Sequence, residues 1–114
     1  MKFVPINNYP NYMISKEGVI KSIDRFENRT SKRGKHYTIF HKGQTLRQLK
    51  QTKGYKMVNL YNDFGWSFPL VHRLVAEHYH KDYKPEVMIR FKDGNPDNCK
   101  LSNLVITKFE HNRG

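Results

Sequence analysis

The sequence has one cysteine, no long apolar run and few acidic residues. Cys99 alone permits neither an internal disulfide nor a zinc cluster built from cysteines, which suits a reducing compartment. No apolar stretch approaches the roughly 20 residues that cross a bilayer. The opening residues, MKFVPINNYP, lack the basic region and apolar core of a signal peptide. We therefore expect a cytoplasmic chain with no membrane partner, and its 114 residues predict one compact, two-lobed unit.

Basic residues outnumber acidic ones by 21 to 10, which gives a net charge of +11. Residues 1–57 carry 13 basic and 3 acidic side chains, whereas residues 58–114 carry 8 and 7, so the excess is local. Glu27 is the only acidic residue between positions 25 and 56. A solubilising surface is one explanation, but aromatic residues and glycines interleaved with the charges favour contact with nucleic acid. The predicted nucleic-acid contacts in this stretch are Arg25, Arg29, Lys32, Arg33, Lys35, Lys42, Arg47, Lys50, Lys53 and Lys56.

The first two thirds of the chain have the alternating pattern of short strands. Residues 3–24 predict a small antiparallel hairpin, with the turn at residues 15–18 and Gly18 free to take a positive φ. Residues 25–35 are polar and basic, and they predict a loop or a mobile arm. Residues 36–72 alternate apolar and polar side chains, which predicts two or three further strands.

The last third combines a helix with a final strand and turn. Val71, Leu74, Val75 and Tyr79 recur at helical spacing in VHRLVAEHYH. The segment VMIRFKDGNPDN predicts a strand that runs into a turn. Thr107 stands three residues before Glu110, the spacing of a capping box, and this predicts a helix that starts at Thr107.

No strong catalytic or metal-binding pattern is evident from spacing alone. The six histidines form no ligand cluster in sequence, and no glycine-rich phosphate loop or nucleophile elbow is present. For His72, at the start of the predicted helix, we expect a structural hydrogen bond rather than a catalytic role.

Four segments, read in order, resemble the phage and intron-encoded HNH homing endonucleases. They are FVPINNYPNYMISKEGVIKSIDR, GQTLRQLKQTKGYKMVNL, VHRLVAEHYH, and DGNPDNCKLSNL followed by EHN. Phe3 stands where the first module usually has tryptophan. The resemblance covers nearly the whole chain and implies an α+β fold. A small antiparallel strand module at residues 1–55 would bind nucleic acid, and a ββα HNH-like unit would follow at residues 56–114.

The resemblance also identifies the positions at which the family places its catalytic groups. A histidine general base follows an aspartate or asparagine metal ligand, and two asparagines follow 12 and 21 positions after that histidine. Asn103 and Asn112 match the two later positions, but Arg90 and Phe91 occupy the first two. Phenylalanine cannot accept a proton, and a guanidinium repels Mg²⁺. Loss of most of the catalytic acceleration is therefore expected, and Arg90 is free to contact a phosphate.

A metal site in a shifted register would need other ligands. Asp93, Asp97 and His111 are the candidates, although both aspartates also suit the side-chain to backbone hydrogen bonds of a turn. Without a histidine to orient, Asn103 is expected to be a structural hydrogen-bonding residue. We expect no cofactor, unless the chain is active, in which case Mg²⁺ with Asn112 as a ligand is implied.

Three hypotheses about function follow. The first is a nuclease-inactive relative that binds double-stranded DNA, with Tyr37, Tyr55 and Tyr61 on strands that could reach a groove. The second is an active, Mg²⁺-dependent nicking endonuclease with displaced catalytic groups. The third is a phage-encoded protein that has reused the fold to bind and inhibit a host protein. We favour the first, in the cytoplasm of a phage-infected or bacterial cell.

Overall fold

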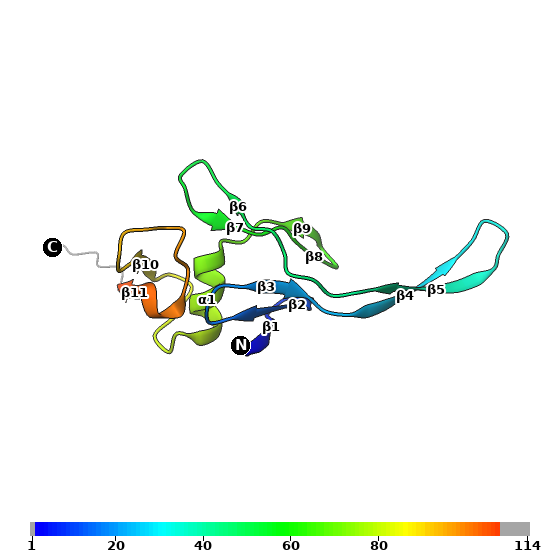
Figure 1. The fold of residues 1–114 in the computed structure, drawn as a ribbon, viewed down its shortest axis with the longest axis horizontal. Coiled ribbons are helices and arrows are strands. Elements are labelled where there is room, and N and C mark those ends of the chain that lie inside the picture. Colours follow the sequence, from blue (N-terminus) through cyan, green and yellow to red (C-terminus); the bar gives the residue numbers. More distant parts are fainter. Residues whose placement is uncertain (1, 108–114) are drawn as a thin grey trace.

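The computed structural model describes residues 2–107 and confirms an α+β protein built mostly from short antiparallel strands (Figure 1). Its extents are 67 × 29 × 28 Å, and the long dimension comes from one hairpin that projects from the body. In chain order the elements are β1 (Phe3–Ile6), β2 (Tyr9–Ser15), β3 (Ile20–Ser22), β4 (Arg25–Thr30), β5 (His36–His41), β6 (Leu49–Lys50), β7 (Lys56–Met57), β8 (Leu60–Asn62), β9 (Gly65–Ser67), α1 (Val71–Tyr79), β10 (Met88–Phe91), the 3₁₀ turn η1 (Leu101–Asn103) and β11 (Leu104–Thr107).

Strands β1, β2 and β3 form an antiparallel sheet in that order. The predicted turn at residues 15–18 is confirmed, because the Gly18 N–H donates to the Ser15 carbonyl at 3.0 Å and Gly18 has a φ of 85°. A side chain at position 18 would also meet Cys99, since a Cβ there would lie 3.3 Å from the Cys99 Cβ. Glycine therefore satisfies both the turn and the close approach of the C-terminal segment.

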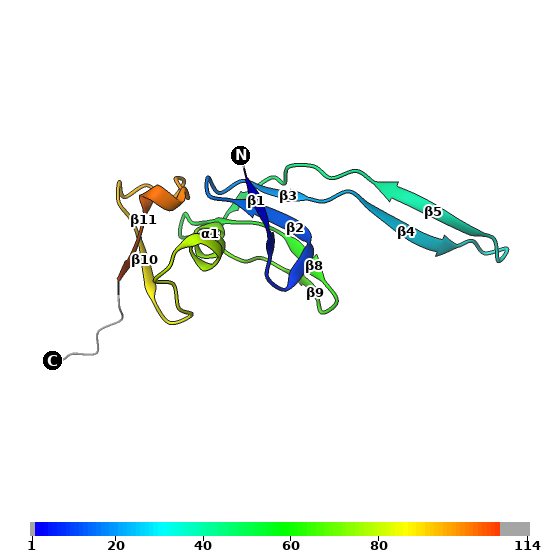
Figure 2. The same cartoon turned by 90° about the horizontal axis from the view of Figure 1, so that it is seen from below.

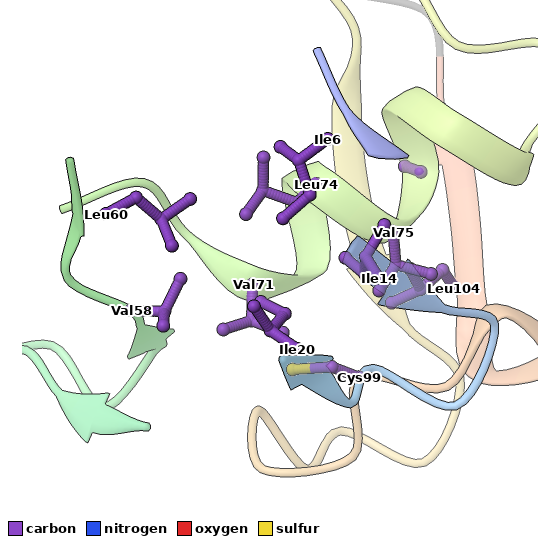
Figure 3. Close-up of a cluster of buried hydrophobic side chains, with 11 residues drawn as sticks. Ile6, Ile14, Ile20, Val58, Leu60, Val71, Leu74, Val75, Cys99 and Leu104 are labelled. Carbon is purple, nitrogen blue, oxygen red and sulfur yellow. The ribbon is translucent and has the colours of Figure 1, made fainter. Parts of the chain in front are cut away.

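Helix α1 lies at the centre of a single apolar core (Figure 3). The helix confirms the spacing seen in VHRLVAEHYH, and Val71, Val75 and Ala76 are completely buried on it. The other buried members come from the first sheet, the middle of the chain, α1 itself and the C-terminal segment, and they are Ile6, Ile14, Ile20, Val58, Leu60, Leu74, Cys99 and Leu104. The core therefore joins the strand module to the C-terminal unit.

Hydrogen bonds connect the same two parts of the chain. The Tyr79 hydroxyl on α1 donates to the Ile14 carbonyl of β2 at 2.7 Å, and the Leu101 N–H donates to the Lys16 carbonyl at 2.8 Å. The boundary expected between residues 55 and 56 falls inside the β6–β7 hairpin, in which Leu49 pairs with Met57.

The expectation of a loop at residues 25–35 was wrong for its first half. Arg25–Thr30 is strand β4, which pairs with β5 along its whole length, and the turn is confined to the residues between the two strands. Cross-strand side-chain pairs explain why so polar a segment is extended. The rings of Phe26 and Phe40 lie 5.0 Å apart, and the Thr38 hydroxyl donates to the Asn28 side chain at 3.0 Å.

Two other predictions differ in detail from the structure. Residues 36–67 contain five strands rather than two or three, because tight turns divide the segments after β5 into four strands of two or three residues. Thr107 is the last residue of β11, and the helix predicted to start there lies outside the described residues. Within residues 2–107, no helix has the length and apolar character needed to cross a membrane.

Gly43 lies where the chain returns from β5 to the body. Its N–H donates to the Asp24 carboxylate at 2.6 Å, and a Cβ at this position would collide with the Ser22 carbonyl oxygen and lie 2.9 Å from the Ile23 carbonyl carbon. The return segment is then held against β3, since the Leu46 N–H donates to the Ile20 carbonyl at 2.8 Å. Contact between the two backbones therefore requires glycine here.

We predict that Gly43→Ala lowers the free energy of unfolding by ~1–3 kcal/mol, because neither backbone can move away without breaking this attachment. Urea denaturation checks the prediction. Gly34→Asn at the arm's turn is the matched control, since Gly34 has a φ of 82° that asparagine tolerates and open space around its Cβ. Equal stability of the two variants would contradict the proposed contact.

Candidate nucleic-acid interface and nuclease-like site

The ten basic residues predicted to contact nucleic acid lie on two hairpins and the segment between them. The arm is defined as residues 25–41, comprising β4, β5 and their turn, and it carries five of the ten. The β6–β7 hairpin, residues 49–57, carries three. Figure 1 shows both hairpins projecting from the body, and Figure 2 shows the arm projecting in a second view. Nine of the ten side chains are exposed, and only Lys56 is half-buried.

The two faces of the arm differ in chemistry. The cross-strand register places Arg25, Arg29, Tyr37 and His41 around Glu27 on one face. The other face carries three facing pairs without a Lys or Arg, and they are Phe26 with Phe40, Asn28 with Thr38, and Thr30 with His36. The turn between the strands contains Lys32, Arg33 and Lys35, all exposed. The arm thus combines cationic groups with a row of uncharged hydrogen-bonding groups.

The Glu27 side chain is paired with two neighbouring side chains on the arm. Its carboxylate accepts from the Arg29 Nε at 2.9 Å and lies 2.8 Å from the His41 Nε2. These hydrogen bonds, first from Arg29 and then from His41, lower the pKa of Glu27 to about 2. Because the single acid of this stretch is paired locally, no salt bridge within the described residues involves the lysines and arginine of the turn.

Phe91, for which the resemblance predicted the position of the general base, is packed against other aromatic rings. It is the last residue of β10 and pairs with Leu104 of β11. Its ring lies 5.0 Å from the ring of His72 and is stacked 6.1 Å from that of Tyr55, and these two rings lie 5.2 Å apart. The three rings join β10, α1 and the β6–β7 hairpin. This aromatic cluster was not foreseen from the sequence, because its members are far apart along the chain.

Arg90 lies on the opposite face of β10 from Phe91 and is exposed. Strand alternation sends the two neighbouring side chains to opposite sides of the hairpin. The guanidinium is therefore available to solvent, while the residue beside it packs against the aromatic cluster.

His72 is 5% exposed and lies deep in the aromatic cluster. Burial, and then the nearby positive charge of Arg73, lower the pKa of His72 to about 4. Its Nδ1 has no hydrogen-bond partner among the described residues, so the expected structural hydrogen bond is absent at that atom. The imidazole therefore packs as a neutral ring against Phe91.

Asp93 and Asn103 organise the turn that follows β10. The Asp93 carboxylate accepts from the Asn95 N–H at 2.8 Å and from the side chains of Asn98 and Asn103, both at 3.0 Å. These donors, with Asn95 the strongest, lower the pKa of Asp93. The Asn103 amide also donates to the Asn98 carbonyl at 2.9 Å and accepts from the Asp93 N–H at 3.2 Å. Its hydrogen-bonding capacity is thus taken up inside the turn.

The second carboxylate near β10, that of Asp97, contacts a different hairpin. Asp97 forms a salt bridge with Lys50 of the β6–β7 hairpin, with 2.9 Å between the Lys50 Nζ and the Asp97 Oδ2. No group of three or more His, Cys, Asp or Glu side chains that could hold a metal occurs within residues 2–107. With a fixed cation at Arg90 and an aromatic ring at Phe91, the described residues do not fit the divalent cation that HNH endonucleases generally use. Asn112 and His111 lie outside the described residues.

The strand module, the central helix and the β10–β11 hairpin together define the class of HNH endonucleases. Residues 1–61 match the NUMOD4 motif, and residues 70–113 match the HNH endonuclease model. The chain belongs to the HNH homing endonuclease family.

Individual relatives agree with this assignment. Over 74 residues, 65% of the chain and 42% of the relative, it is 35% identical to the DNA endonuclease I-HmuI of Bacillus phage SP01. Over 104 residues, 90% of the chain and 22% of the relative, it is 29% identical to an uncharacterized HNH endonuclease of Acanthamoeba polyphaga mimivirus.

A solved structure of DNA binding and cleavage by the HNH homing endonuclease I-HmuI matches with a TM-score of 0.71 and 29% identity. The match covers 95% of this chain and 53% of that one. The chain therefore spans about half or less of the length of these relatives.

The low pKa of His72 predicts a dependence of stability on pH. His72 has its ordinary pKa of 6.5 in the unfolded chain but a pKa of about 4 in the folded chain. Its contribution to the stability of the fold is therefore fully present above pH 6.5 and is lost as the pH falls from 6.5 to 4. Urea midpoints across this range should fall by the equivalent of ~1–3 kcal/mol as the pH is lowered. His72→Phe, which keeps an aromatic ring in the cluster, should remove most of that fall. An unchanged pH dependence in the variant would contradict this account.

Proposed function

We propose that this chain binds double-stranded DNA through the arm and the β6–β7 hairpin, and that it does not cleave the DNA. The observation that carries the proposal is the concentration of exposed cationic residues on two projecting hairpins, beside a nuclease-like site whose general-base position is a packed phenylalanine. The DNA endonuclease named among its relatives supports the choice of DNA.

The arm has a suitable shape for a DNA groove. The major groove of B-DNA is about 12 Å wide and admits a two-stranded ribbon. The uncharged face, with Asn28, Thr38 and Thr30, offers donors and acceptors of the kind that read base edges, and Phe26 and Phe40 offer apolar contact with a thymine methyl. Lys32, Arg33 and Lys35 at the turn are free to contact phosphates, which contribute affinity without sequence preference.

The proposed absence of cleavage rests on residues 90 and 91. Hydrolysis of a phosphodiester needs an activated water and stabilisation of the charge that develops on the phosphate. Phe91 cannot take a proton, and Arg90 places a positive charge where the family has a metal ligand. Asp93 is held by three hydrogen bonds, and Asp97 is paired with Lys50 through its Oδ2 while its buried Oδ1 has no hydrogen-bond partner among the described residues. Asp97 alone would be one ligand beside a cation, which is too few to replace a metal site.

The arm's turn should control affinity for DNA. Replacing Lys32, Arg33 and Lys35 together by glutamate should weaken binding to duplex DNA at least about tenfold and reduce the slope of log affinity against log salt by about 2 to 3, because phosphate contacts release counterions. Fluorescence anisotropy across a salt series measures both quantities. The matched control is the same reversal at Lys81, Lys84 and Lys100, which are exposed but lie outside both hairpins.

Equal losses in the two triple variants would indicate a response to net charge alone and would contradict the arm as the binding surface. Reversal at Lys50, Lys53 and Lys56 tests the second hairpin, but there a glutamate would also face Asp97, so its folding must be checked first.

A supercoiled-plasmid nicking assay tests the proposed loss of cleavage. We expect no nicking in Mg²⁺ or Mn²⁺ and a gel shift that persists in EDTA, because no working general base occupies position 91. Asn112→Ala is the control for any residual metal-dependent activity. Nicking by the native chain that disappears in EDTA and in this variant would overturn the proposal in favour of displaced catalytic groups.

A further inference from the structure

The β8–β9 hairpin exposes a group of aromatic side chains that the DNA-binding surface does not use. Phe64, in its two-residue turn, is 99% exposed, and Trp66 on β9 is 65% exposed. Tyr61 is paired with Trp66 across the hairpin, and their ring centroids lie 5.0 Å apart. Single exposed aromatic residues are common, but a cluster of this kind marks an interaction surface.

A hollow of about 450 Å³ lies beside these side chains. It is lined on one side by residues 8–11, from the β1–β2 turn and the start of β2, and on the other by residues 61–64 of the β8–β9 hairpin. The Asn62 side chain donates to the Asn8 carbonyl at 2.9 Å, and the Tyr9 hydroxyl lies 2.5 Å from the Ser67 Oγ. These bonds connect the two walls, so the hollow is already formed without a ligand.

The charge of this surface is opposite to that of the hairpins that bear the basic residues. The two segments that build it, residues 3–15 and 57–70, contain no lysine or arginine, and their only charged side chain is Asp63. Asp63 is exposed at the rim and forms no salt bridge within residues 2–107. A nucleic acid would bring phosphates to a place with no cation to neutralise them, whereas a cationic group would find a carboxylate and aromatic rings together.

We propose that this hollow binds an arginine or lysine side chain of a partner protein. The cation would lie against the rings of Tyr61, Tyr9 and Phe64, whose faces attract positive charge, with Asp63 as its counterion. Apolar residues beside the cation on the partner would cover Trp66. The site is separate from the arm and the β6–β7 hairpin, and of the tyrosines expected to reach a groove it includes only Tyr61. Either proposal can therefore fail without the other.

Trp66 is the only tryptophan of the chain, and it contacts Tyr61 at the edge of the hollow, so its fluorescence reports binding directly. The probe is a hexapeptide that alternates arginine and leucine, titrated into the intact chain. We expect a saturable change in Trp66 emission even though the chain itself carries a net charge of +11. A peptide with glutamate in place of each arginine should give no such change.

Asp63→Asn should weaken binding of the arginine peptide about fivefold or more, because it removes the counterion but keeps the shape of the side chain. Asp82→Asn, at an exposed carboxylate outside the hollow, is the matched control and should bind like the native chain. A urea denaturation curve for each variant shows whether it is folded.

Three results would overturn the proposal. They are no change in Trp66 emission, equal responses to the arginine and glutamate peptides, or unchanged affinity in a folded Asp63→Asn variant. A saturable change in Trp66 emission on addition of duplex DNA, with equal affinity in the native chain and in Asp63→Asn, would also overturn the proposal and assign the aromatic surface to nucleic acid.

Discussion

Burial of the apolar face of α1 is the interaction on which the rest of the molecule depends. Val71 and Val75 are completely buried there, against Ile14 and Ile20 from the first sheet and Leu104 from the last strand. Two-stranded hairpins have little independent stability in water, so the projecting hairpins need a rigid base. The helix and the sheet packed on it supply that base, and Gly43 attaches the arm to it. Damage to this core would therefore disturb every surface at once.

The site beside α1 combines the fold of the family with a packed aromatic residue at position 91. A histidine base must keep access to water and substrate, whereas Phe91 packs against His72 and Tyr55. The ring also helps to keep His72 neutral, because its surroundings disfavour a charged imidazole. Asn103 keeps the turn in place through its hydrogen bonds to the Asp93 carboxylate and the Asn98 carbonyl.

Charge is separated on this molecule into surfaces of different chemistry. The arm and the β6–β7 hairpin carry 8 of the 21 basic residues and only one acidic residue, whereas the β8–β9 hairpin carries aromatic rings and one carboxylate. Under the two proposals, ligands of opposite charge would bind different residues of one small chain. The net charge of +11 therefore does not describe the β8–β9 surface, where the only charged side chain is Asp63.

The sequence by itself determined the elements that follow from local periodicity and turn chemistry. Helix α1 and the turn at Gly18 could be read from the residues in order, whereas the predicted change of residues at positions 90 and 91 came from the resemblance to the HNH family. Only the tertiary structure decided that polar Arg25–Thr30 is a strand, that Phe91 meets His72 and Tyr55, and that Phe64 and Trp66 remain exposed. These properties depend on contacts between residues far apart in the chain, or on their absence, and local pattern carries no information about either.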